Sequence, residues 1–121
     1  MSEFARATRE SWEILPLPTE REPIQLSLVF SGADGERMRR GSIPRGMDDK
    51  WFIFFENGWL YFYRSWTGAC IFGARLDSSS EGVRVADAWA SRNQSQYKSM
   101  GLETDKELVT QLLWFAARMR R

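Results

Sequence analysis

The sequence predicts an α+β fold, in which an antiparallel β-meander of about four strands is packed by a C-terminal α-helix and preceded by a short N-terminal helix or arm. Three patterns predict it: an Asn57-Gly58 pair between two aromatic runs, alternating segments on both sides, and an amphipathic stretch near the C-terminus. A chain of 121 residues has the size of one domain. We expect a single domain over 1–121, with an arm over 1–20 and the sheet and helix over 23–121.

Asn57-Gly58 predicts a type I′ β-hairpin, because both central residues of that turn need a positive φ. Two-residue closure pairs strands 51–56 and 59–64, from Glu56 opposite Trp59 to Trp51 opposite Arg64, and paired residues share a face. The first face is apolar enough for a core and carries Trp51, Ile53, Phe55, Leu60, Phe62 and Arg64. The second is typical of a surface that is partly covered or partly used, and carries Phe52, Phe54, Glu56, Trp59, Tyr61 and Tyr63.

Apolar patterning predicts the remaining strands. Residues 23–30 alternate as a half-buried strand, with the inward face carrying Ile24, Leu26, Leu28 and Phe30. A tight connection over 65–68 leads to a third strand near 69–76, and a fourth is expected over 83–89. By contrast, Ser31 to Asp49 holds four glycines and a proline, so we expect a long loop or a loosely formed hairpin there.

Helical patterns appear at both ends of the chain. Near the N-terminus a short helix or ordered arm is expected, ended by Pro16 and Pro18, with the helically spaced residues Phe4, Ala5, Thr8, Trp12 and Leu15. After an irregular segment over 92–101, a C-terminal helix is expected to begin at Thr104 with a capping box to Glu107. Its predicted sheet-facing stripe is Leu108, Leu112, Phe115, Ala116 and Met119, with Arg118, Arg120 and Arg121 at the negative end of the helix dipole.

Composition excludes several classes of function. The chain has no histidine, which removes histidine triads, histidine general bases and nearly all catalytic zinc sites, and we expect neither a metal nor a cofactor. Cys70 is the only cysteine, so no intramolecular disulfide can form; we expect a buried structural thiol and a cytoplasmic protein. A net charge of +1 makes nucleic acid an unlikely partner, and no apolar run suggests a membrane partner.

A cationic segment between Arg37 and Lys50 is the first candidate site. Glycines there could let backbone amides face a phosphate or sulfate, and the candidate ligand-binding side chains are Arg39, Arg40, Arg45 and Lys50. The segment matches neither a P-loop nor a dinucleotide fingerprint. Its simpler interpretation is a solvated charged loop, which we favour.

The turn after the hairpin is the second candidate site. Its candidate ligand-binding residues are Trp51, Arg64, Ser65, Trp66 and Thr67. A nucleotide or peptide could stack on Trp66 while Arg64 holds an anion. The alternative, which we favour, is a turn held by hydroxyl groups, with Arg64 paired to an acid and Trp66 plugging the end of the sheet.

Three carboxylates could in principle act in acid/base chemistry or bind a metal: Asp48, Asp49 and Glu56. Their spacing matches no metal-binding loop. Glu56 is more simply explained as a charge that protects the hairpin end from aggregation. We therefore assign no catalytic residue.

The motif RGMDDKWFIFFE, followed by WLYF and RSWTG, resembles that of a small bacterial family with no established activity. Later matches at Val85–Trp89, at Arg92–Tyr97 and in the terminal helix extend the resemblance to roughly residues 24 to 121. Since that family has no assigned activity, the resemblance implies no functional residue.

The leading hypothesis is a non-catalytic cytoplasmic binding or accessory module, monomeric or homodimeric, for a small anion, a nucleotide or a protein partner. A histidine-free hydrolase or transferase acting on a phosphate or glycosidic bond is the first alternative, with Glu56 or Asp49 as base and Arg64 as an electrostatic clamp. An inhibitor or immunity-type protein is the second, and it predicts an exposed apolar patch.

Overall fold

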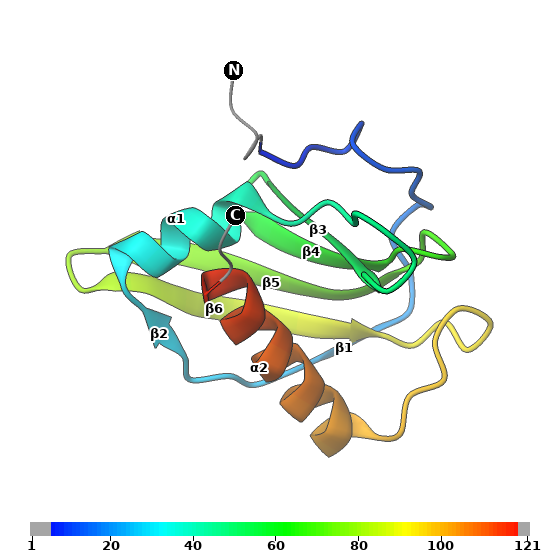
Figure 1. The fold of residues 1–121 in the computed structure, drawn as a ribbon. Coiled ribbons are helices and arrows are strands. Elements are labelled where there is room, and N and C mark those ends of the chain that lie inside the picture. Colours follow the sequence, from blue (N-terminus) through cyan, green and yellow to red (C-terminus); the bar gives the residue numbers. More distant parts are fainter. Residues whose placement is uncertain (1–5, 119–121) are drawn as a thin grey trace.

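The computed structural model describes residues 6–118 and shows a single-domain α+β fold (Figure 1). Its elements are β1 (Arg21–Pro23), β2 (Val29–Phe30), α1 (Gly32–Arg40), β3 (Trp51–Glu56), β4 (Trp59–Arg64), β5 (Cys70–Ser79), β6 (Gly82–Ser91) and α2 (Leu102–Arg118). The strands form one antiparallel sheet in the order β1-β6-β5-β4-β3, with β2 also paired to β6. The sheet thus has six strands rather than about four, because the segment before α1 supplies two short ones.

The hairpin register is the predicted one. Glu56 lies opposite Trp59, Trp51 lies opposite Arg64, and every pair between them agrees. Asn57 and Gly58 have φ of 54° and 87°, as a type I′ turn requires.

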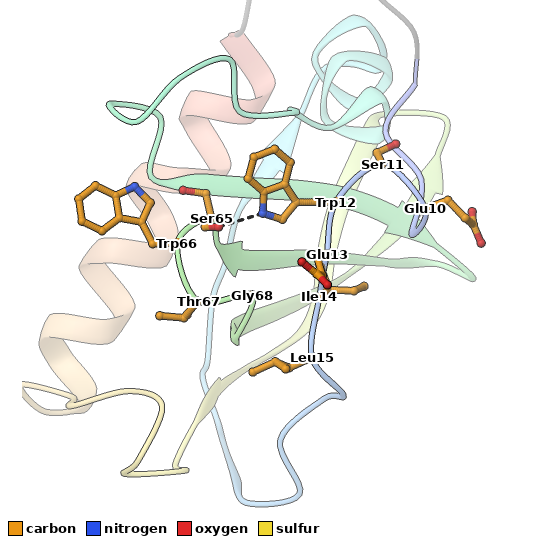
Figure 2. A pocket seen from close by; sticks show the side chains of 10 residues that line it. All are labelled: Glu10, Ser11, Trp12, Glu13, Ile14, Leu15, Ser65, Trp66, Thr67 and Gly68. Atoms are coloured by element: carbon orange, nitrogen blue, oxygen red, sulfur yellow. Dashed lines mark hydrogen bonds between the residues drawn. The ribbon is translucent and has the colours of Figure 1, made fainter.

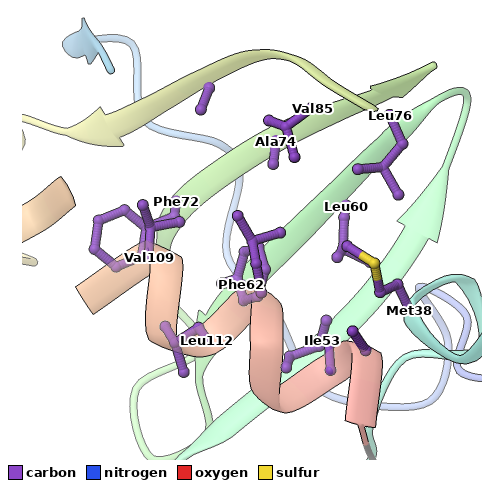
Figure 3. Packing of buried hydrophobic residues seen from close by; sticks show 14 of the residues in the cluster. Met38, Ile53, Leu60, Phe62, Phe72, Ala74, Leu76, Val85, Val109 and Leu112 are labelled. Carbon is purple, nitrogen blue, oxygen red and sulfur yellow. The ribbon is translucent and has the colours of Figure 1, made fainter. Parts of the chain in front are cut away.

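Each face of the sheet is covered by a different part of the chain. Both helices lie across one face (Figure 1), where the first hairpin face meets the buried side chains of α2 (Figure 3). This larger cluster includes Met38, Ile53, Leu60, Phe62, Phe72, Val109, Leu112 and Leu113. The N-terminal arm covers the other face, where Ala7 and Trp12 pack with Phe52, Phe54 and Tyr63. The second hairpin face is therefore mainly a covered surface.

Helix α1 replaces the loop or loose hairpin predicted for this part of the chain. Ser31 caps it by accepting a hydrogen bond from the Asp34 amide at 3.0 Å, and Gly41 ends it with a φ of 72°. Met38 is fully buried, and Arg37 Nε donates to the carbonyl of Ala117 on α2 at 2.6 Å. The helix depends on these tertiary contacts because its sequence lacks an apolar stripe. Residues 41–50 are irregular apart from a bridge between Ser42 and Ile53.

The alternation predicted for residues 23–30 is confirmed, but the continuous strand is not. Ile24 and Phe30 are buried, Leu26 and Leu28 are half-buried, and the residues between them are exposed. Only the two ends pair with β6 as β1 and β2. The third and fourth predicted strands are present as β5 and β6, and both are longer than expected because they continue to a turn at residues 80 and 81.

The N-terminal segment is an arm rather than a helix over residues 6–20. Its contacts run along the sheet: the Ala7 amide donates to Arg40 O at 2.8 Å, and the Leu15 amide donates to Gly68 O at 2.9 Å. Phe4 and Ala5, which belonged to the predicted helical spacing, lie outside the described residues.

Helix α2 begins at Leu102, two residues before the predicted start, so Thr104 lies inside the first turn and forms no capping box. This shift changes the buried face: Phe115 is 52% exposed, while Val109 and Leu113 are buried beside the correctly predicted Leu112 and Ala116. Leu108 is half-buried, and Arg118 lies in the last turn as expected. Met119, Arg120 and Arg121 lie outside the described residues.

Candidate anion-binding site

A pocket of about 410 Å³ opens at the end of the hairpin opposite the Asn57-Gly58 turn. It lies where the ends of β3 and β4 meet the irregular segment between β6 and α2. Its lining residues are Lys50, Arg64, Trp66, Thr67, Gln96, Tyr97 and Lys98. Three of these side chains are cationic and none is a carboxylate, so the pocket has the charge expected of an anion-binding site.

Arg64 is the central cation of this pocket. Its guanidinium lies over the Trp51 ring, with Cζ 4.9 Å from the ring centroid. Its Nε is buried and has no hydrogen-bond partner, and Arg64 forms no ion pair within residues 6–118. The favoured alternative, a pairing of Arg64 with an acid, is therefore wrong. A guanidinium that is partly buried without an anionic partner retains donors for a ligand.

Lys50 and Lys98 are the other two cations of the lining, and both are exposed. Neither forms an ion pair with a carboxylate in the part of the chain that the structure describes. Lys50 extends the start of β3, whereas Lys98 lies in the segment before α2. Their ammonium groups can therefore approach an anion from different segments of the chain.

The turn after β4 is held by backbone and hydroxyl contacts. Ser65 Oγ donates to Asp49 O at 2.8 Å, and the Ser65 amide donates to Lys50 O at 2.9 Å. Thr67 Oγ1 accepts from the Ala69 amide at 3.2 Å. Ser65 is buried and supports the turn, while Thr67 is exposed and lines the pocket. The predicted role of the hydroxyls in holding the turn is thus confirmed.

Trp66 does not plug the end of the sheet. Its side chain is 70% exposed, and its Nε1 donates to Met47 O at 3.1 Å. The indole is therefore anchored by one edge and left open at the rim of the pocket.

The remaining predicted candidates do not join this pocket. Arg39 on α1 donates to Ser78 Oγ at 2.6 Å and lies over the Phe55 ring at 5.6 Å. Arg40 and Arg45 are exposed, and neither lines the pocket. The cationic segment is split because its first half is the helix α1, so only Lys50 from its far end reaches the site.

Sequence reasoning missed Gln96, Tyr97 and Lys98, which complete the pocket from the irregular segment. Asp105, at the start of α2, is fully buried and holds this segment in place. Its carboxylate accepts from the Tyr97 hydroxyl and from Ser99 Oγ at 2.6 Å, and it forms an ion pair with Arg92 Nη1 at 2.9 Å. Burial, and then the hydrogen bond to Asp105, raise the pKa of Tyr97, so its phenol stays protonated. An acidic residue in the first turn of a helix was the only signal of this network.

A second, larger pocket of about 720 Å³ lies between the arm and the turn (Figure 2). Its lining includes Glu10 and Glu13 but no cation, so its chemistry does not suit an anion. Trp12 closes part of this region by donating from Nε1 to Ser65 O at 2.9 Å. In Figure 2 the Trp66 indole projects away from the arm, on the other side of Ser65 from Trp12.

The candidate acids do not converge with Arg64. Glu56 lies at the opposite end of the hairpin and accepts from Arg9 Nε at 3.0 Å, a contact that lowers the pKa of Glu56. Asp49 Oδ2 accepts from the Arg45 amide at 2.9 Å. Among the described residues, no group of acidic and cysteine side chains is arranged to hold a metal ion.

Cys70 is a buried thiol, as predicted, and burial raises its pKa to about 12. Neither α1 nor α2 is long and apolar enough to cross a membrane. No protein-family model, curated protein or solved structure matches this chain, and its resemblance to a bacterial family stays a prediction.

Proposed function

We propose that this protein is a non-catalytic binding module that holds a small anion in the pocket between the hairpin end and the segment before α2. The observation that carries the proposal is the lining itself, with the three cations Lys50, Arg64 and Lys98 and no carboxylate. We place the module in the cytoplasm, because its single cysteine is a buried free thiol.

The isolation of Arg64 supports this role. Seven of the eleven other arginines in the described residues pair with carboxylates, and the four that do not, Arg6, Arg21, Arg40 and Arg45, are exposed. The paired ones are Arg9, Arg37, Arg39, Arg75, Arg84, Arg92 and Arg118. Arg64 has a buried Nε and only an aromatic ring beside it. Because a partly buried cation is costly without a counter-charge, an anion from solution would bind here with a favourable electrostatic contribution.

The position of Glu56 favours binding over hydrolysis. A histidine-free hydrolase would need a carboxylate base within hydrogen-bond reach of the substrate held by Arg64. Glu56 is at the other end and on the other face of the hairpin, where Arg9 engages it. Asp49 contributes its side chain to a backbone contact with Arg45.

Isothermal titration with phosphate, pyrophosphate and sulfate tests the proposal. We expect saturable binding that Arg64→Ala weakens by about tenfold or more, because a hydrogen bond to a charged group contributes roughly 1.5–3 kcal/mol. Arg84→Ala is the matched control, since Arg84 is an exposed arginine on β6 that pairs with Asp77 outside the pocket.

Because Arg64 also contacts Trp51, a second variant guards against a folding defect. Lys98 is exposed, so Lys98→Glu should leave the thermal midpoint unchanged while weakening every anion. Absence of saturable binding by the wild-type protein at millimolar anion would refute the proposal. So would equal binding by wild type, Arg64→Ala and Lys98→Glu.

A further inference from the structure

Trp66 is the one tryptophan with an uncovered ring that lies beside the cationic pocket. Four of the others contact another aromatic ring, and the fifth lies under a guanidinium: Trp12, Trp51, Trp59 and Trp114, then Trp89. Trp66 has no such partner within residues 6–118, yet its Nε1 is fixed to Met47 O at 3.1 Å. An indole that is oriented but uncovered offers a stacking surface at little entropic cost.

Gln96 adds a second unused polar group to the same pocket. Its Oε1 is buried and has no hydrogen-bond partner among the described residues. A carboxamide oxygen accepts up to two hydrogen bonds, and an unsatisfied buried acceptor is costly. A ligand that donates from an amino group or ring N–H would satisfy this acceptor, which sulfate, whose oxygens carry no proton at neutral pH, does not.

The size of the pocket also exceeds what a bare anion needs. Its volume of about 410 Å³ falls within the roughly 300–1,000 Å³ of small-molecule sites. A water molecule, with one heavy atom, takes about 30 Å³, so phosphate or sulfate, with five heavy atoms, would occupy only a part of this volume. The ligand therefore has a second part besides the anionic group.

We propose that the ligand is a nucleoside phosphate, with its phosphate among Lys50, Arg64 and Lys98, its base stacked on Trp66 and a base amino group donating to Gln96 Oε1. This inference rests on the proposed function and names the ligand class of that same site. A flat ring, a hydrogen-bond donor and an anion joined in one small molecule match the three groups of the lining.

Calorimetric titration with the four common nucleoside monophosphates, and with inorganic phosphate as the reference anion, tests the inference. We expect at least one base with an amino group to raise affinity about fivefold or more over phosphate, because stacking of one base contributes at least that much. We expect UMP, whose base donates only from its ring N3–H, to bind less tightly than that nucleotide, because the proposed donor to Gln96 Oε1 is an amino group.

Four variants assign the effect to the ring and the amide. Trp66→Ala should reduce nucleotide affinity to the level of phosphate while leaving phosphate affinity within twofold, and Trp66→Phe should restore part of the gain. Gln96→Glu should weaken nucleotides and phosphate through its charge, whereas Gln96→Leu should weaken only the nucleotides. Phe115→Ala is the control, since Phe115 is an exposed aromatic residue on α2 outside the pocket.

The outcomes separate this inference from the proposed function. If phosphate binds and all four nucleotides bind no more tightly, the ligand class is wrong and the anion site stands. If neither phosphate nor any nucleotide binds, both proposals fail. A 5′-phosphorylated single-stranded tetranucleotide that binds more tightly than every mononucleotide would overturn the free nucleotide as the ligand and assign the same contacts to a strand end.

Discussion

Two charged side chains near the hairpin end, Asp105 and Arg64, differ in burial and in whether their buried polar atoms have hydrogen-bond partners. Asp105 is fully buried, its two oxygens accept hydrogen bonds from Tyr97 and Ser99, and it forms an ion pair with Arg92. Arg64 has a buried Nε with no hydrogen-bond partner and a ring beneath its guanidinium. A buried charge whose polar atoms all have partners stabilises the fold. A charged group with an unpartnered buried atom beside a pocket is a candidate for ligand binding. The contrast indicates a structural role for Asp105 and supports the proposal that Arg64 binds an anion.

Asp105→Asn should lower the free energy of unfolding by roughly 3 kcal/mol, because it removes the charge that Arg92 and two hydroxyl groups engage. Urea denaturation of both proteins measures the difference. Thr104→Ala is the matched control: Thr104 is the preceding exposed residue of the same helix, and its loss should change stability by less than about 0.5 kcal/mol. An Asp105→Asn protein as stable as wild type would contradict the structural role of the network.

At the scale of elements, the hairpin turn is determined by local backbone chemistry. Gly58 has a φ of 87°, and a Cβ added there would meet no atom within 4 Å. The cost of a side chain at this position is therefore conformational and not steric. Gly32, the first residue of α1, also has open space around a Cβ, but its φ is not in the left-handed region.

These two glycines give a matched pair of substitutions. Gly58→Ala should destabilise the protein by about 1–2 kcal/mol, because an L-residue resists the left-handed conformation. Gly32→Ala should stabilise it by about 0.5 kcal/mol, because alanine restricts the unfolded chain at a position where the helix tolerates it. Thermal or urea unfolding measures both. If Gly32→Ala lost as much stability as Gly58→Ala, the left-handed backbone conformation would not explain the cost of a side chain at Gly58.

Elements with a local signal could be predicted from the sequence. The hairpin register follows from Asn57-Gly58, and the strands β5 and β6 follow from their apolar runs. Helix α1 could not be predicted, since Met38 is its only large buried apolar residue and Arg37 binds a carbonyl on a distant helix. The shifted face of α2 follows from the start at Leu102, where no capping box signals the boundary.

The candidate site was predictable only where residues are near one another along the hairpin. The β3–β4 register places Trp51 beside Arg64, and Trp66 and Thr67 follow in the next turn. Gln96, Tyr97 and Lys98 reach the same place through β6 and the segment before α2, which no local pattern indicates. The cationic segment between Arg37 and Lys50 was misleading for the opposite reason. Its residues are close in sequence, but the formation of α1 separates Arg39 and Arg40 from Lys50.

At the scale of the whole molecule, the sheet has one strongly packed face and one held by an arm. The helical face buries a large cluster that joins α2 to the five strands β2 to β6, part of which is drawn in Figure 3. The arm is attached by a smaller cluster around Ala7 and Trp12 and by polar contacts, including the Ala7 amide to Arg40 O, the Leu15 amide to Gly68 O, and Arg9 to Glu56. Segments with fewer buried contacts open at lower free energy than the core. We therefore infer that the arm detaches without global unfolding.

Native-state amide hydrogen exchange tests this order of opening. The amides of Ala7 and Leu15 should exchange through an opening that has a lower free energy and a smaller dependence on denaturant than the opening that exposes the amide of Leu113. Leu113 lies on α2 and is fully buried. Equal opening free energies at all three amides would show that arm and core unfold as one unit.

Acid should favour detachment of the arm, because Arg9 lowers the pKa of Glu56 in the folded state. A carboxyl group whose folded pKa is lowered stabilises the fold above its ordinary pKa of about 4.3, and the contribution is lost as pH falls through the folded value. Arg9 itself keeps its charge throughout, since its pKa is raised by Glu56. Between pH 6 and pH 3, the opening constant at Ala7 relative to Leu113 should rise about two- to threefold, the modest effect of an exposed ion pair.

Two variants test whether Glu56 causes this change. In Glu56→Gln the ratio of the two opening constants should be raised already at pH 6 and should not change with pH. Glu10→Gln should behave as wild type, because Glu10 is exposed and pairs with no arginine among residues 6–118.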